Sequence, residues 1–403
     1  MKRILILYHS SVFDLHPGAD SHIYYTSKSL SRKYNVTLVT WGKGKSKEVK
    51  EDNLTIIHFG NQKTNQSSKR ARVKFSHFHE FVSYLGLNYL LFMKTTGPSI
   101  DEFSEVVKGR FDLVIRIPFN NSRIPGYLQT SYGVPIIELA IVSGIPNYLK
   151  NVGEWIKFIN RPSVIGGRLS SKLHRILGMV ISRLYKYSLS SHNVVTISFS
   201  DLKVFKSLGL TETKYIPPII VYNPPNKSSL TRDTVLFFSG RSIVARIALE
   251  FIARAACMLK DIDFIITGVP PNDFATNEVL NNLTIAGYLP KEDFEKLLSE
   301  CSLIIFPLVS GSGVQTKMIE ALCNGKPIIT TSVIAEQFPN LISGINLIIE
   351  DDPLNFVNKI GSTLKNDKLK EDLGKNAKEY YLRNLAPNYA LRLLENYIEN
   401  MWG

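Results

Sequence analysis

Glycines between an apolar run and a helical run give the clearest chemical signal in the chain. The apolar stretch LIIFPL (303–308) leads into VSGSGV (309–314), and helical spacing follows. Gly311 and Gly313 let backbone N–H groups approach a ligand closely, and a helix N-terminus favours negative charge. The pattern predicts a site for a phosphate-bearing ligand; a tight strand-to-helix turn without a ligand is the alternative.

Two polar side chains follow on the predicted helix. Lys317 falls in its first turn or so, within reach of a phosphate, and Glu320 lies about one turn further on. A carboxylate can accept hydrogen bonds from both hydroxyls of a ribose. The pair therefore favours a nucleotide as the ligand, and an exposed Glu320 on an ordinary helix is the alternative.

The segment VLFFSGRSIVAR (235–246) supplies a second signal. A predicted strand ends in Gly240-Arg241, and another cation, Arg246, follows five residues later. Two cations at a strand end can clamp both groups of a diphosphate. Both signals lie at carboxyl ends of strands in one predicted sheet, where ligands of open α/β folds bind. A solvated loop with ordinary surface arginines is the alternative.

Two series of alternating strands and helices position these residues. The first begins with RILILY (3–8) and continues to NVVTIS (193–198); the second begins near residue 233. Such alternation is typical of a parallel sheet with crossover helices. The sequence therefore predicts an α/β fold of two doubly wound domains.

The proline-rich stretch 216–232 is the predicted join between these domains, because neither a helix nor a central strand tolerates its four prolines. We predict an N-terminal domain over 1–215, a linker over 216–232 and a second domain over 233–385. A final helix within 386–403 is free to cross back to the first domain.

Residues 233–352 resemble the donor-binding domain of family 4 glycosyltransferases, whose GT-B architecture has two Rossmann-like domains facing across a cleft. SGR with a cation five residues later is similar to the family's Gly-Arg…Lys diphosphate clamp, with Arg246 where lysine is usual. The stretch GYLPKEDFEKLLSECSLIIFPLVSGSG resembles the family's approach to the sugar site. The family's signature, two glutamates with seven residues between them, ends at Glu320, its ribose-binding position.

The resemblance implies a hexosyltransferase-like enzyme that moves a sugar from a nucleotide-diphosphate sugar to a lipid-linked, glycan or other acceptor. It implies retention of the anomeric configuration, and neither a metal nor another cofactor, since the nucleotide sugar is a substrate. It also implies that residues 1–215 form the domain that binds the acceptor. The implied donor site comprises Gly18 of the first domain together with Gly240, Arg241, Arg246, Ser312, Gly313, Val314, Lys317 and Glu320.

Two departures from the family leave questions open. Ser312 stands where the first glutamate of the signature is expected, so the chain is a GSG-loop variant and its sugar is not specified. The family's catalytic histidine has no match after VPIIELAIV (134–142). Glu138 and Arg116 end nearby strands and are the candidate catalytic residues, with a structural role as the alternative. A nucleotide-sugar epimerase, a phosphorylase of the same fold and a degenerate nucleotide-sugar-binding protein remain as alternative functions.

Charge is distributed unevenly. The net charge is +13, and residues 1–200 contain 27 basic and 12 acidic residues, so all the excess belongs to the first half. This excess suggests an anionic partner, either a membrane surface or a lipid-phosphate acceptor. An amphipathic basic helix at 167–187 and an apolar stretch at 78–94 fit such a role, and core packing is the alternative for both. Nucleic acid is disfavoured, since no nucleic-acid-binding motif is recognisable.

We expect a cytoplasmic protein, with peripheral membrane association left open. The apolar run after Met1 spans only about five residues, too short for a signal peptide, and no stretch reaches the ~20 apolar residues of a membrane span. Three scattered cysteines indicate a reducing compartment. Neither Asp261-Ile262-Asp263 nor the pair His77 and His79 has the setting of a metal site.

Overall fold

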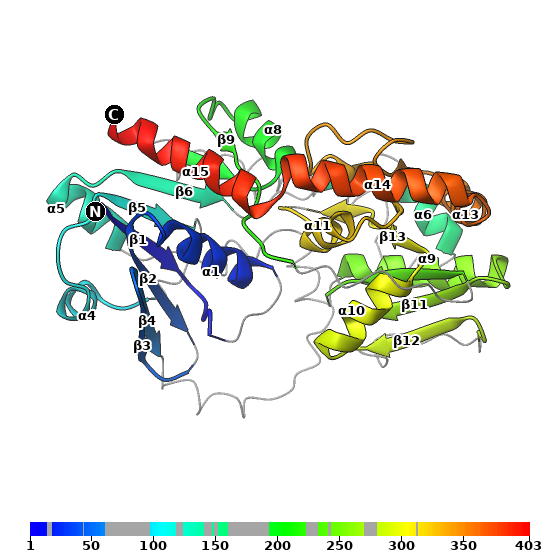
Figure 1. The fold of residues 1–403 in the computed structure, drawn as a ribbon, viewed down its shortest axis with the longest axis horizontal. Coiled ribbons are helices and arrows are strands. Elements are labelled where there is room, and N and C mark those ends of the chain that lie inside the picture. The colour runs from blue at the N-terminus through cyan, green and yellow to red at the C-terminus, as the bar shows by residue number, and fades with distance from the viewer. Residues whose placement is uncertain are drawn as a thin grey trace. The chain divides into compact units, whose positions relative to one another are not determined.

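The structure is a computed structural model and divides into two compact units (Figure 1). It describes residues 1–13, 18–42, 44–60, 97–117, 124–140, 147–148, 152–159, 193–222, 233–240, 243–269, 280–311 and 313–403. Unit 1 comprises Met1–Ile145, Arg175–Val221 and Ala386–Gly403; unit 2 comprises Pro146–His174 and Tyr222–Leu385. The predicted segments 78–94 and 167–187 lie outside the described residues.

Unit 1 contains a sheet in the order β3-β4-β2-β1-β5-β6-β8-β9, in which all pairs are parallel except β3 with β4. The strands are β1 (Arg3–Tyr8), β2 (Asn35–Gly42), β3 (Lys47–Glu51), β4 (Leu54–Gly60), β5 (Leu113–Arg116), β6 (Ile136–Ala140), β8 (Asn193–Thr196) and β9 (Lys214–Tyr215). The helices are α1 (Ala19–Leu30), α4 (Ile100–Val106), α5 (Ile124–Tyr132), α8 (Phe199–Ser207) and α15 (Pro387–Trp402).

Unit 2 contains a parallel sheet in the order β12-β11-β10-β13-β15-β16. Its strands are β10 (Thr234–Phe238), β11 (Asp263–Thr267), β12 (Leu283–Gly287), β13 (Leu303–Phe306), β15 (Ile328–Thr330) and β16 (Ile348–Ile349), and a separate pair joins β7 (Asn147–Tyr148) to β14 (Ser310–Gly311). The helices are α6 (Val152–Ile159), α9 (Ile243–Met258), α10 (Lys291–Glu300), α11 (Thr316–Cys323), α12 (Ser332–Ala335), α13 (Pro353–Leu364) and α14 (Asp367–Asn384).

The predicted α/β fold is confirmed, and the apolar runs that predicted it are its central strands. Every residue of β10 and β13 is buried, as is every residue of β1 after Arg3. Parallel strands covered on both faces need such continuous apolar sequence rather than alternation. The order of each sheet also creates a point where successive connections leave in opposite directions. That point lies between β1 and β5 in unit 1 and between β10 and β13 in unit 2.

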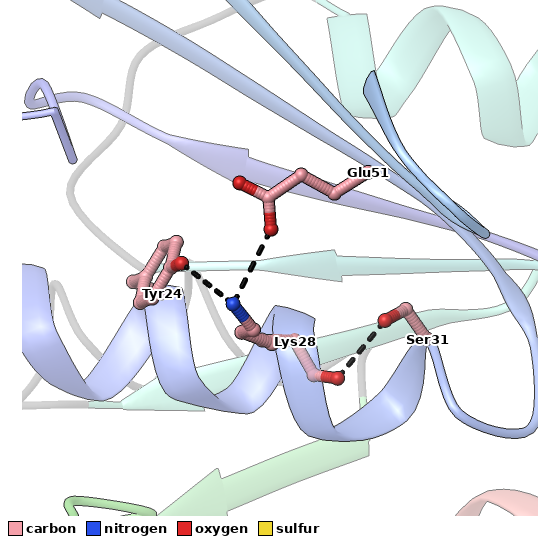
Figure 2. Close-up of polar contacts among 4 residues, drawn as sticks. All are labelled: Tyr24, Lys28, Ser31 and Glu51. Atoms are coloured by element: carbon pink, nitrogen blue, oxygen red, sulfur yellow. Dashed lines mark hydrogen bonds and ion pairs between the residues drawn. The ribbon is translucent and has the colours of Figure 1, made fainter. Parts of the chain in front are cut away.

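Helix α1 begins directly after Gly18, whose φ of 121° favours glycine. On its exposed side, Lys28 donates to the Tyr24 hydroxyl at 3.2 Å and to Glu51 at the end of β3 at 3.3 Å (Figure 2). The Ser31 hydroxyl donates to the Lys28 carbonyl at 2.9 Å, which satisfies an acceptor in the last turn (Figure 2). These contacts tie the helix after the Gly18 turn to the edge of its own sheet.

The passage from unit 1 to unit 2 lies inside the predicted linker. Of that linker, residues 216–222 are described, and unit 1 ends at Val221. The Ile219 N–H donates to the Nδ1 atom of His22 on α1 at 3.0 Å. Burial lowers the pKa of His22 to about 4, so the ring is neutral and Nδ1 accepts this bond at neutral pH. The end of unit 1 is thereby fixed to α1.

The division into units differs from the predicted domain boundaries at β7 and α6. Both fall within the predicted first domain, between β6 and β8, yet they belong to unit 2. The physical reason is local packing. The Trp155 ring of α6 lies against Phe251 of α9 and Phe356 of α13.

Helix α15 is part of unit 1, although it follows unit 2 in sequence. Proline at its first position suits a helix start, because that N–H has no partner within the helix. Lys33 forms an ion pair with Glu399, and the Trp402 indole N–H donates to the Asp112 carbonyl at 3.2 Å.

None of the helices in the described ranges is long and apolar enough to cross a membrane.

The buried face of α15 generates a stability prediction. Ile398 is fully buried, so Ile398→Ala should lower the free energy of unfolding by about 2–5 kcal/mol through lost burial and the cavity left behind. Urea denaturation followed by circular dichroism measures the change. Asn400→Ala, at an exposed position of the same helix, is the control and should stay within about 0.5 kcal/mol. Equal effects in the two variants would contradict the packing of α15 described here.

Candidate functional site

The candidate donor residues of unit 2 gather at the carboxyl edge of its sheet. Strand β13 leads through β14 and Gly313 into α11, and β10 leads through Gly240 toward α9. These two strands are neighbours at the point where the connections reverse direction. Ligands of open α/β sheets bind in the crevice at such a point. The structure thus brings the two predicted signals to one edge of one sheet.

The glycines of this edge have separate structural reasons. Gly313 has a φ of 71°, a conformation that favours glycine. A Cβ on Gly311 would lie 2.9 Å from the Gln337 side-chain amide nitrogen and 3.4 Å from Ile334. Gly240 is exposed, and a Cβ there would meet nothing within 4 Å. Glycine is therefore needed by the protein itself at 311 and 313, whereas at Gly240 it leaves open space in which a ligand can approach the backbone.

Gln337 is a residue of this site that sequence reasoning missed. Its side chain is 2% exposed, and its carbonyl oxygen accepts the N–H of Gln315 at 2.6 Å, directly before the first turn of α11. Gln337 therefore holds the glycine loop from one side, with its amide nitrogen against Gly311. The available signal was a glutamine among apolar residues in VIAEQF, since a buried polar side chain needs a specific partner.

Helix α11 buries one face in the core and presents Lys317 and Glu320 at its half-buried margin. Burial lowers the pKa of Lys317 and raises the pKa of Glu320 to about 7; in both cases the charge of the other residue opposes the change. Tyr222 adds a contact at the same helix, where its hydroxyl donates to the Thr316 carbonyl at 3.0 Å. Perturbed pKa values in a crevice are typical of functional sites.

Four further candidate donor residues, Arg241, Arg246, Ser312 and Val314, were predicted for unit 2. Arg246 is exposed in the first turn of α9, the helix that follows Gly240, and Val314 lies half-buried before α11. Arg241 and Ser312 lie outside the described residues. The structure brings Arg246 and Val314 to the same sheet edge as Lys317 and Glu320.

Three candidates lie in unit 1. Arg116 and Glu138 occupy paired positions of β5 and β6 and form an ion pair, with the Glu138 side chain 0% exposed. Breaking a buried pair leaves an uncompensated charge, so this contact has a structural value of its own. Gly18 lies at the N-terminus of α1, near the hydrogen bond of 2.5 Å from the Tyr8 hydroxyl to Asp20.

The Asp261-Ile262-Asp263 segment lies away from the candidate site. Asp263 opens β11, so it lies at the amino edge of the sheet, opposite the glycine loop. Among the described residues, no group of three or more His, Cys, Asp or Glu side chains is placed to hold a metal ion. His77 and His79 lie outside the described residues.

Sequence comparison identifies the region that contains this site. Residues 233–366 match the family model described as "Glycosyl transferases group 1". A stretch of 171 residues is 28% identical to the uncharacterized glycosyltransferase MJ1178 of Methanocaldococcus jannaschii and covers 40% of this chain and 48% of that protein. The match thus spans about half the length of that relative. The predicted similarity to glycosyltransferases is confirmed at the level of a group 1 domain.

Solved structures identify the fold. Sucrose-phosphate synthase of Thermosynechococcus elongatus is similar with a TM-score of 0.62 and 12% identity, over 100% of this chain and 99% of that chain. HepE of Anabaena, solved in complex with UDP and glucose, is similar with a TM-score of 0.64 and 13% identity, over 99% of this chain and 100% of that chain. The fold is GT-B, as the sequence predicted.

The contact between Gln337 and Gln315 generates the second prediction. Gln337→Leu removes the acceptor of the Gln315 N–H, which should cost about 1–2 kcal/mol of unfolding free energy and speed hydrogen exchange at that amide. Hydrogen-exchange mass spectrometry of a peptide over 313–318 measures the exchange. Gln337→Glu is the matched control, because it keeps an acceptor oxygen and should retain most of the protection. Unchanged exchange in Gln337→Leu would show that the bond does not order the loop.

Proposed function

We propose that this protein is a glycosyltransferase that transfers a sugar from a nucleoside-diphosphate sugar to an acceptor hydroxyl. The observation that carries the proposal is the pair Lys317 and Glu320 on α11, next to a glycine loop at the reversal point of the sheet. This pair lies within the residues that match the group 1 glycosyl transferase model. The similarity of residues 233–352 to family 4, including the GSG-loop variant, belongs to the same proposal.

The donor would bind with its ribose at Glu320 and its diphosphate along the glycine loop. Lys317, Arg246 and Arg241 supply positive charge, and backbone N–H groups at the start of α11 add donors. During transfer, the bond between the anomeric carbon and the β-phosphate oxygen breaks as the acceptor oxygen bonds to that carbon. The acceptor proton leaves with a base or a phosphate oxygen, and these cations stabilise the departing diphosphate.

Three finer features complete the proposal. Transfer retains the anomeric configuration, proceeds without a metal because cationic side chains take that role, and uses Glu138 or Arg116 on the acceptor side. The positive charge of residues 1–200 supports an anionic acceptor such as a lipid phosphate, or an anionic membrane surface near it. Proton NMR of the product would report the configuration, and activity in excess EDTA would test the metal.

The donor is identified by a thermal-shift panel of UDP, GDP, ADP and their glucose or mannose conjugates. A ligand that binds the folded state raises the melting temperature by mass action. UDP-glucose is the first probe, because HepE of similar fold was solved with UDP and glucose. Conversion of the donor without an acceptor would favour an epimerase. Binding with neither hydrolysis nor transfer would favour a degenerate binding protein, which the absence of glutamate at Ser312 keeps in consideration.

The raised pKa of Glu320 predicts a pH dependence of donor binding. With a pKa of about 7, the carboxyl is mostly protonated at pH 6 and mostly ionised at pH 8. The ionised form accepts two ribose hydrogen bonds, so affinity for UDP-glucose should rise several-fold, at most about tenfold, between these values. UDP-glucose suits the measurement by calorimetry, because its diphosphate is esterified at both ends and does not titrate near neutral pH.

Two variants control this measurement. Glu320→Ala should weaken binding at pH 8, and Glu320→Gln should bind with little dependence on pH because its amide does not ionise. Affinity that is unchanged in Glu320→Ala would exclude the ribose role. Affinity that still rises with pH in Glu320→Gln would assign the titration to another group.

A further inference from the structure

A short segment of unit 2, which lies between β6 and β8 in the sequence, pairs with the strand that enters the glycine loop. We call β7 and α6 together the arm; α6 is drawn in cyan-green in Figure 1 among the later-coloured elements of unit 2. Strand β7 pairs antiparallel with β14, so that Tyr148 is opposite Ser310 and Asn147 is opposite Gly311. Strand β14 continues directly into the loop that contains Gly313. The arm therefore contacts the backbone that leads into the candidate diphosphate site.

Trp155 anchors the arm. Its side chain is 0% exposed, and its ring lies 4.7 Å from that of Phe251 on α9 and 5.8 Å from that of Phe356 on α13, centroid to centroid. Its indole N–H donates to the Asp351 carbonyl at 2.6 Å. A buried tryptophan with a satisfied N–H is a rigid and energetically large contact. The arm is thus held by core packing, whereas β7 and β14 are too short to hold each other.

The anchor also connects to the other elements of the site. Phe251 belongs to α9, whose first turn carries Arg246 and follows Gly240. The Asp351 carboxylate accepts the Ser332 N–H at 2.8 Å at the start of α12. Helix α12 carries Ile334, which faces Gly311, and is followed by Gln337. Trp155 therefore contacts two neighbours of the site. One is α9, whose first turn carries Arg246. The other is Asp351, whose carboxylate holds the start of α12, the helix that precedes Gln337.

We propose that the arm is a positioning element of the donor site, so that the glycine loop is ordered by residues of unit 2 that lie far from it in the sequence, between β6 and β8. Gln337 supports the loop from one side and β7 pairs with the strand that enters it. Loss of the Trp155 anchor releases β7, and β14 then has no strand partner among the described residues. Trp155 acts through the loop and does not touch the ligand. The inference rests on the proposed function only for the identity of that ligand, the donor diphosphate.

The test uses the full-length protein and two measurements. Trp155→Ala should speed hydrogen exchange across residues 309–316 and weaken UDP-glucose binding on the order of tenfold, because binding must then order the loop. Trp155→Phe keeps the ring packing and loses only the hydrogen bond to Asp351, so it should show a smaller change of the same kind. Phe264→Leu is the matched control. It reduces a fully buried side chain of β11, outside the arm and the loop, and should lower the melting temperature with exchange at 309–316 unchanged.

The outcomes separate this inference from the proposed function. Faster loop exchange in both Trp155 variants, with normal exchange in Phe264→Leu, supports the arm. Unchanged loop exchange in Trp155→Phe and in folded Trp155→Ala overturns it, even if the melting temperature falls. If Trp155→Ala does not fold, the result for Trp155→Phe decides. A wild-type protein that binds none of the nucleotide sugars would defeat the proposed function, and the exchange measurement would still decide on the arm.

Discussion

The burial of a lysine and a glutamate one turn apart on α11 is the constraint on which the site depends. Burial lowers the pKa of Lys317 and raises the pKa of Glu320, so it favours the neutral form of each. The charge of each residue opposes the shift in the other. Taking ionisable groups out of water costs free energy that an apolar pair in the same place would not cost. A diphosphate beside Lys317 and ribose hydroxyls beside Glu320 would replace the lost hydration. The arrangement therefore makes physical sense as a preorganised receptor for a nucleotide, and less sense as packing alone.

The backbone in front of α11 is constrained by several contacts. Gly313 adopts a positive φ, and Gly311 has no room for a side chain because Gln337 and Ile334 lie against it. Gln337 accepts the Gln315 N–H and thus satisfies a donor that the helix itself cannot pair. Each of these contacts comes from a residue distant in sequence. The backbone at Gly311 and at Gln315, on either side of the loop, is consequently held by residues from another part of the chain.

The sequence was sufficient for features that depend on local pattern. Continuous apolar runs such as 303–306 predicted buried parallel strands, and the order of strands and helices predicted that Gly240 and the glycines before α11 share one edge of the sheet. The sequence was insufficient where long-range packing decides. Nothing local to Trp155 indicates that its ring lies against Phe251 and Phe356, so the predicted first domain over 1–215 includes β7 and α6, which pack within unit 2. The role of Gln337 was hidden for the same reason, because its partner lies 22 residues away.

The two units carry different chemical groups at the points where the connections of their sheets reverse direction. In unit 2 the edge between β10 and β13 carries glycines and a helix N-terminus, which suit an anion. In unit 1 Arg116 ends β5, the strand next to β1, and its register partner Glu138 lies in the middle of β6; the two side chains form an ion pair. The Glu138 side chain is 0% exposed, so this ion pair neutralises charge inside unit 1 rather than presenting Glu138 to a ligand. The reversal point of unit 2 thus has groups that suit an anion, whereas the charged pair at the reversal point of unit 1 compensates itself.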